Sequence, residues 1–138
     1  MWIVYAFGSA LFAGLTSILA KCGIRKTDST LATALRTPVV LAFSWLMVFA
    51  EGSQGQLGAI DGKSLLFLLL SGLATGASWL CYFKALHDGP ASVVVPIDKL
   101  SILVTIGFSC AVFHERLTRK AALGLLALTA GTLIMVVA

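Results

Sequence analysis

The chain has 138 residues, of which 59% are hydrophobic and only 12% are charged, whereas about 25% of residues are charged in an ordinary soluble domain. A soluble domain of this size covers its surface with polar side chains, and here there are too few of them. The formal net charge is +4, but the basic residues are scattered between long apolar runs and form no basic stripe. The composition therefore excludes a soluble enzyme, a disordered chain and a nucleic-acid reader, and indicates an integral membrane protein.

Five apolar windows follow one another along the chain. A helix that spans a membrane needs about 20 apolar residues, because a core of ~30 Å is crossed at about 1.5 Å per residue. The windows cover about residues 2–20, 30–50, 64–86, 92–113 and 119–137. They predict an all-α integral membrane protein with five transmembrane helices in a single domain, residues 1–138.

The connectors between the windows carry signals for helix ends. Gly23 is suited to a left-handed cap that ends the first helix, and residues 27–30 offer N-cap side chains for the second. The longest connector, 51–62, holds four glycines and two acids and is predicted to be a solvated loop. Residues 87–90 form a turn signal, and Thr118 is a candidate cap for the last helix.

Basic residues at the ends of the windows are balanced between the two sides of the membrane. An excess of positive charge in the cytoplasmic loops normally fixes orientation. Four basic residues lie on the side of the first connector and four on the side that holds Met1: Lys21, Arg25, Lys26 and Lys84 on the first, Lys63, Arg116, Arg119 and Lys120 on the second. This balance predicts insertion in both orientations, and a single orientation with a weak bias is the alternative.

Three charged residues lie inside the windows. Arg36, Asp98 and Lys99 are each about six residues from the end of a window, and intramembrane charges are costly and usually face a cavity or a partner. We interpret Arg36 and Asp98 as an ion pair between the second and fourth spans. Pro38 and Pro96 are close by, and proline bends a helix, so both are candidate hinges. These features indicate a solute pathway, while charges that snorkel to the boundary remain the alternative.

The candidate substrate site combines these charges with aromatic residues at the end of the third span. Within the spans the balance is basic, which favours an anionic or zwitterionic solute over a cation. Asp98 is the one deep acid and is therefore the candidate for proton coupling. Ordinary packing is the alternative role for the aromatic residues. The candidate substrate-binding residues are Arg36, Lys99, Trp79, Tyr82 and Lys84.

Several short motifs occur in a characteristic order along the chain. They are Lys21-Cys22-Gly23-Ile24, Ala32-Thr33-Ala34-Leu35-Arg36-Thr37, Ala85-Leu86, Gly89-Pro90-Ala91-Ser92, Val95-Pro96-Ile97-Asp98-Lys99-Leu100-Ser101, Glu115-Arg116-Leu117-Thr118 and Gly124. Their order resembles the EamA domain of the drug/metabolite transporter superfamily, and in particular a prokaryotic subgroup of lone domains of about this length. The resemblance covers nearly the whole chain.

This resemblance implies a fold and a function. Most EamA transporters consist of two such domains fused with inverted orientation, so a lone domain implies an antiparallel, dual-topology homodimer. The fold would be half of an inverted-repeat bundle around a central cavity. The implied function is secondary active transport of a small-molecule metabolite by alternating access. The protein would lie among the lipids of the prokaryotic inner membrane, with no cofactor and no bound metal.

Other functional classes are less well supported by the sequence. The first span contains no acid, so a resemblance to small multidrug resistance transporters, whose mechanism depends on one there, fails. No nucleotide-binding motif is present, which argues against coupling to ATP within this chain. A membrane enzyme is the weakest reading, because His87 and His114 are expected at opposite faces of the membrane. A membrane subunit that assembles with another protein and does not itself transport is the main alternative.

Overall fold

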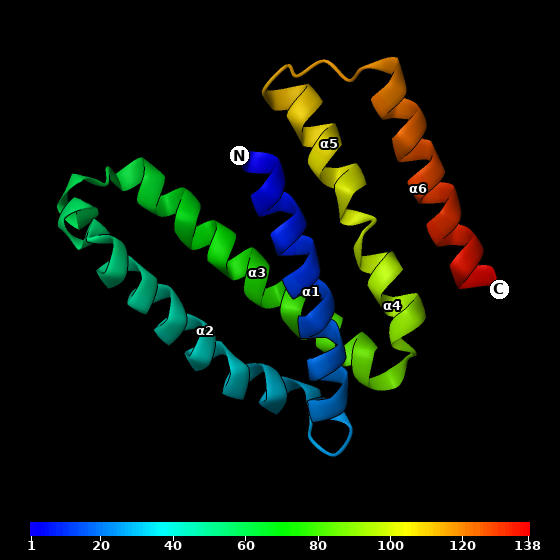
Figure 1. Ribbon diagram of the computed structural model, residues 1–138, viewed down its shortest axis with the longest axis horizontal. Helices are drawn as coiled ribbons and strands as arrows, with labels where there is room; N and C mark the ends of the chain where they lie inside the picture. The colour runs from blue at the N-terminus through cyan, green and yellow to red at the C-terminus, as the bar shows by residue number, and fades with distance from the viewer. The chain divides into compact units, whose positions relative to one another are not determined.

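The computed structural model describes residues 1–138 and contains helices joined by short loops, with no strand (Figure 1). Five helical segments are long and apolar enough to cross a membrane, when α4 and α5 are taken together as one segment over 91–112. The predicted all-helical, five-span class of fold is therefore confirmed. The helices are α1 (Trp2–Ile24), α2 (Ser29–Glu51), the 3-10 helix η1 (Ser53–Ala59), α3 (Gly62–Asp88), α4 (Ala91–Asp98), α5 (Ser101–Val112) and α6 (Arg119–Val137).

The chain divides into two compact units. The first unit comprises residues 1–17 and 88–138, and therefore holds most of α1 together with α4, α5 and α6. The second unit comprises residues 18–87, which are the end of α1, the whole of α2 and η1, and all of α3 except its last residue.

In the second unit, two local motifs fix the ends of α2. The carboxylate of Asp28 accepts hydrogen bonds from the backbone N–H groups of Thr30 (3.0 Å) and Leu31 (3.1 Å), so Asp28 is the N-cap within the predicted range 27–30. At the other end Gly52 has a φ of 71°, a left-handed conformation that glycine adopts at little cost. The start and the end of α2 are thus set by side-chain and backbone chemistry that is local in sequence.

The predicted cap at Gly23 is wrong. α1 continues to Ile24, and Gly23 lies inside the helix rather than in the left-handed region. Two tertiary interactions stabilise the added turn: Ile24 is only 2% exposed, and the Lys21 ammonium donates a hydrogen bond to the backbone carbonyl of Leu86. Burial of an apolar side chain outweighs the ~1 kcal/mol by which glycine disfavours a helix interior.

The connector 51–62 is more ordered than a loop. Ser53–Ala59 forms the 3-10 helix η1, which packs against α2. Short 3-10 helices are common as connectors because their hydrogen bonds close over three residues. Their residues stay largely exposed here, so the connector keeps the solvated character that its glycines and acids predict.

The buried hydrophobic side chains are concentrated at one end of the second unit. Ile24 of α1 and Phe83 and Leu86 of α3 are at most 2% exposed, and Ser29 and Thr33 of α2 are buried beside them in the same unit. Elsewhere most large apolar side chains are exposed, as expected for helices that face lipid. This small core holds together the ends of α2 and α3, which carry the first group of candidate site residues.

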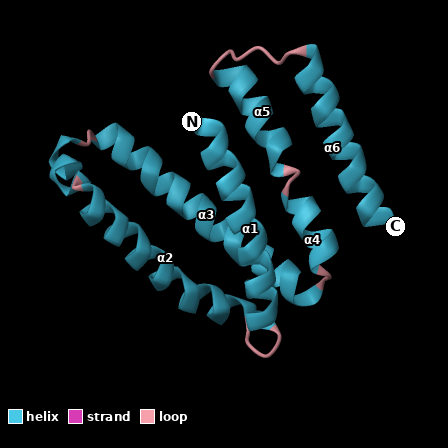
Figure 2. Ribbon diagram, viewed as in Figure 1, coloured by secondary structure: helices cyan, strands magenta, loops and turns pink.

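In the first unit, the fourth span is interrupted. α4 ends at Asp98 and α5 begins at Ser101, and the break is visible between these helices in Figure 2. The N–H of Lys99 donates to the carbonyls of Val95 and Pro96, and the N–H of Leu100 donates to that of Ile97. Bonds to the third residue back tighten the backbone relative to an α-helix, so the two half-helices are joined by a tight turn.

The two prolines inside helices have different surroundings. Pro96 lies in the last turn of α4, immediately before the interruption, whereas α2 continues through Pro38 without a break. The first unit is held in part by packing of α4 against α6, which begins at the N-cap Thr118. The Thr118 hydroxyl accepts a hydrogen bond from the N–H of Ala121 at 3.2 Å, as the sequence predicts.

Candidate functional site

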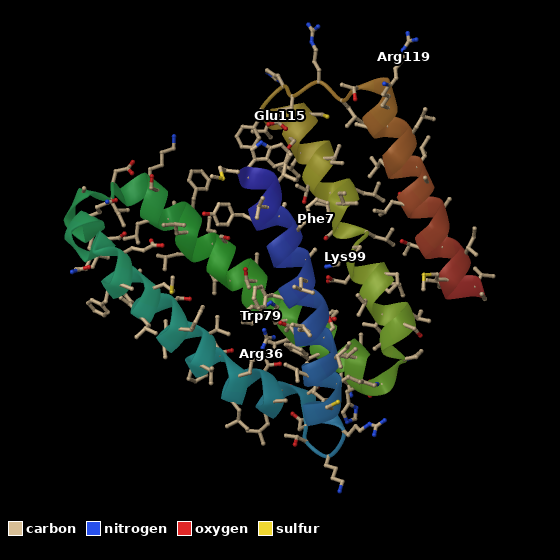
Figure 3. All side chains as sticks on the ribbon, in the orientation of Figure 1. Phe7, Arg36, Trp79, Lys99, Glu115 and Arg119 are labelled. Carbon is tan, nitrogen blue, oxygen red and sulfur yellow. The ribbon has the colours of Figure 1, made fainter.

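The guanidinium group of Arg36 lies over two aromatic rings of α3. Its central carbon is 4.6 Å from the ring centroid of Trp79 and 4.7 Å from that of Phe83. Figure 3 shows Arg36 and Trp79 close together. At these distances the cation is attracted by the negative face of each ring, so the two rings fix the position of the charge.

Helix periodicity explains why the two rings share one arginine. Trp79 and Phe83 are four residues apart in α3 and therefore lie on the same face of that helix. The side chain of Arg36, on α2, is partly buried against this face. The structure thus joins Arg36 and Trp79 and adds Phe83, which was not among the residues predicted for the site.

Tyr82 supports this aromatic group from the side. Its ring packs edge-on against Phe83, with 5.4 Å between centroids and an interplanar angle of 68°. Tyr82 also interacts electrostatically with Arg36. Lys84 is exposed on α3. Of the residues predicted on α3, Trp79 and Tyr82 therefore belong to the Arg36 cluster.

A groove of about 530 Å³ lies between α2 and α3, next to this cluster. Trp79 lines the groove and contacts Arg36, so it belongs to both. The lining includes no charged residue, and two glycines, Gly72 and Gly76, leave room on the α3 side. Five lining residues carry hydroxyl groups: Thr30, Thr33, Thr37, Ser71 and Thr75.

Three of these hydroxyls donate to the backbone of their own helix. Thr33 donates to the carbonyl of Ser29 (2.9 Å), and Thr37 donates to that of Thr33 (2.7 Å). On α3, Thr75 donates to the carbonyl of Ser71 at 2.9 Å. A hydroxyl has one donor and two acceptor lone pairs, so each of these side chains keeps acceptor capacity.

The second group of candidate residues lies at the interruption of the fourth span. The Lys99 ammonium is 3.6 Å from a carboxylate oxygen of Asp98, and the side chains are 56% and 39% exposed. Neither side chain of the pair is buried within the protomer. Asp98 is the last residue of α4, and Lys99 follows it in the turn.

The proposed ion pair between Arg36 and Asp98 joins the two units. Arg36 belongs to the second unit and Asp98 to the first. The structure gives each of them a partner within its own unit: the aromatic rings for Arg36, and Lys99 for Asp98. The pairing of Arg36 with Asp98 stays a prediction, as do the proton-coupling role of Asp98 and the hinge roles of Pro96 and Pro38.

Two features of the site were missed from the sequence. Phe83 could have been found, because it lies four residues after Trp79 and therefore shares its helix face. The hydroxyl groove could not have been found, because it depends on which face of α2 meets α3.

No group of three or more His, Cys, Asp or Glu side chains comes together as a metal site.

Comparison with known proteins agrees with this architecture. The EamA-like transporter family model matches residues 1–137. A protein of Sinorhizobium sp. named as an uncharacterized transporter in the cobO 3' region is 43% identical over 136 residues, which cover 99% of this chain and 96% of that protein. No solved structure matches the chain. With its five membrane-spanning segments, the chain belongs to the EamA-like transporter family.

Proposed function

We propose that this protein is a secondary active transporter of small anionic or zwitterionic metabolites. The observation that carries the proposal is the accessible Asp98–Lys99 pair at the interruption of the fourth span. Interrupted helices with charged groups are common where membrane transporters bind their solutes. The family supports a transport role, and a transporter that binds and releases a solute needs no catalytic group.

Each charged residue has a distinct role in this mechanism. Lys99 attracts the acidic group of the solute, and Asp98 exchanges a proton with the aqueous side. The turn at 99–100 allows the two half-helices to change their angle, with Pro96 removing one backbone hydrogen bond of α4. Arg36, positioned by Trp79 and Phe83, provides a second cation for the solute.

The working form is an antiparallel, dual-topology homodimer in the prokaryotic inner membrane. The balance of basic residues at the two boundaries supports insertion in both orientations. In such a dimer, both sets of charged residues occur twice, related by a two-fold axis in the membrane plane. Alternating access then follows if the two protomers exchange conformations, so that one end of the dimer opens while the other closes.

Solute flux in proteoliposomes tests the proposed function. Lys99→Ala should abolish solute-dependent flux, whereas Asp98→Asn should permit exchange of solute between the two sides but remove its dependence on a pH gradient. Asp61→Asn, just before α3 and outside the pair, is the matched control for Asp98→Asn and should retain flux, because acidic residues contribute little to membrane orientation. Unchanged rates and pH dependence in both variants would show the charges to be structural and favour a non-transporting subunit.

A further inference from the structure

We infer that the α2–α3 groove, defined by Thr30, Thr33, Thr37, Ser71, Thr75 and Trp79, binds the hydroxylated chain of a small organic carboxylate whose acid group pairs with Arg36. This inference rests on the proposed transport function and narrows its substrate class. The groove and the arginine belong to the same unit. Its volume of about 530 Å³ falls in the range of about 300–1,000 Å³ that small-molecule sites occupy.

Arg36 is prepared to receive an acidic group. Its described contacts are with the rings of Trp79 and Phe83 and with Tyr82, and interaction with a ring face uses the charge without using the N–H donors as conventional hydrogen bonds. A guanidinium presents five donors in a planar fork that matches a carboxylate. The rings therefore fix the arginine while its donors stay available for a ligand.

Arg36 lies beside the groove through its contact with Trp79, although it is not among the residues that line the groove. Thr33 lies three residues before Arg36 in α2, and side chains at this spacing lie on the same side of a helix. Thr37 follows Arg36, and both threonines line the groove. Trp79 of α3 connects the two features, since it contacts the guanidinium and lines the groove. A ligand held by Arg36 at its acid end can therefore extend along the hydroxyl groups.

The groove hydroxyls act as hydrogen-bond acceptors, so they favour donor groups on the part of the ligand beyond its carboxylate. The donors of Thr33, Thr37 and Thr75 are used by backbone carbonyls of their own helices, which leaves oxygen lone pairs. These lone pairs accept hydrogen bonds from O–H groups on the ligand. A fully apolar chain would leave the acceptors unmatched, so hydroxyl groups on the ligand improve the fit.

The absence of an acidic residue from the groove disfavours an ammonium group at the far end of the ligand chain. No lining residue is charged, so an ammonium group would be transferred from water without a carboxylate to compensate it. Burial of an unpaired charge is far more costly than burial of a hydrogen-bonded hydroxyl. The groove therefore favours a neutral, hydroxylated chain behind the carboxylate.

Equilibrium binding to purified protein tests this inference without any transport measurement. The reporter is Trp79, made the only tryptophan by Trp2→Phe and Trp45→Phe, and the readout is its fluorescence. Four six-carbon probes separate the chemical properties: hexanoate differs from gluconate by lacking the hydroxyl groups, sorbitol differs from gluconate by lacking the carboxylate, and 6-aminohexanoate differs from hexanoate by its ammonium group. Gluconate should bind at least about tenfold more tightly than each of the others, which corresponds to about 1.4 kcal/mol. Equal or tighter binding of any other probe would overturn the inference.

Variants that keep side-chain shape locate the binding site. Thr37→Val and Thr75→Val should each weaken gluconate binding about 2- to 10-fold, the range for one hydrogen bond, and Arg36→Lys should weaken it more because the fork is lost. Thr129→Val is the control, since this hydroxyl also donates to its own helix, to Leu125, but does not line the groove. Equal losses in the control and the groove variants would contradict the assignment.

A second copy of the chain could fill the same groove with a helix, because glycine and threonine permit close helix packing. In that case the valine variants would change the fraction of dimer, measured by light scattering, and leave gluconate binding unchanged, which would overturn the inference.

Binding of gluconate without flux of any solute would instead support the groove assignment and refute transport. Flux of another solute by a protein that does not bind gluconate would refute the groove assignment alone.

Discussion

The central carbon of the Arg36 guanidinium lies 4.6 Å from the centroid of the Trp79 ring. This contact joins α2 to α3 inside the membrane-spanning part of the second unit, where a cation needs a partner that does not require water. Two rings provide that partner, with Phe83 at 4.7 Å. The arrangement holds a positive charge within a span.

The contact predicts energetic coupling between Arg36 and Trp79. Replacing both residues, Arg36→Met and Trp79→Leu, should destabilise the protein by less than the sum of the single changes, with a coupling of about 0.5–2 kcal/mol. Thermal unfolding in detergent measures it. Trp45→Leu is the control, because Trp45 packs near Phe49 with 6.0 Å between centroids and should show no coupling to Arg36. Additive effects of Arg36 and Trp79 would contradict the prediction.

An ion pair between Arg36 and Asp98, which the sequence predicts, competes with a ligand carboxylate for the Arg36 guanidinium and is therefore the alternative to the groove assignment. Removing either partner of such a pair leaves a charge in a setting of low dielectric, which is strongly destabilising. If the pair forms, the double variant Arg36→Ala with Asp98→Ala should cost about 0.5–3 kcal/mol less than the sum of the singles. Asp61→Ala, just before α3, should be additive with Arg36→Ala. If Asp98 behaves in the same way as Asp61, no such pair exists.

Dual topology predicts partial labelling of η1 from outside the cell. With Cys22, Cys81 and Cys110 replaced by alanine, Gln56→Cys provides one exposed thiol in η1. A membrane-impermeant maleimide added to intact cells should modify only part of the population, because the balanced basic residues allow both orientations. Modification of all copies, or of none, would show a single orientation.

A change in charge balance provides the control for dual insertion. Gln54→Lys and Gly58→Lys add two positive charges to η1, which should place this connector in the cytoplasm and make the thiol at position 56 inaccessible from outside. Co-expression with a copy biased the opposite way should restore the flux lost by the biased protein alone. Restoration of flux without the opposite copy would contradict the antiparallel dimer.

Pro96 predicts a mobile junction between α4 and α5. Pro96→Ala supplies the missing N–H donor to the carbonyl of Ser92 and removes a residue that disfavours a helix interior by ~3 kcal/mol relative to alanine. Spin labels at Val94 and Gly107, one in each half-helix, should show a narrower distance distribution, and flux should fall. Pro38→Ala, in the uninterrupted α2, should leave the distance distribution between α4 and α5 unchanged. An unchanged distribution in Pro96→Ala would refute the hinge.

The sequence by itself determines the class of fold. The thickness of a membrane and the rise of an α-helix fix the length of a span, so five apolar windows are enough to predict five helices. The caps at Asp28 and Thr118 are equally local, because each side chain bonds to a backbone group two or three residues away. The presence of Arg36, Asp98 and Lys99 inside the spans also follows directly from their positions.

Tertiary structure decided the features that depend on how helices meet. Gly23 has the residue type of a helix cap, yet burial of Ile24 and the Lys21–Leu86 hydrogen bond extend α1 past it. Phe83 joins the Arg36 cluster, and the hydroxyl groove forms, only because one particular face of α3 lies against α2. The two ring contacts of Arg36 link residues that are more than 40 positions apart in the sequence. Their register is set by packing, because the hydrophobicity of a lipid-exposed helix is similar on all its faces.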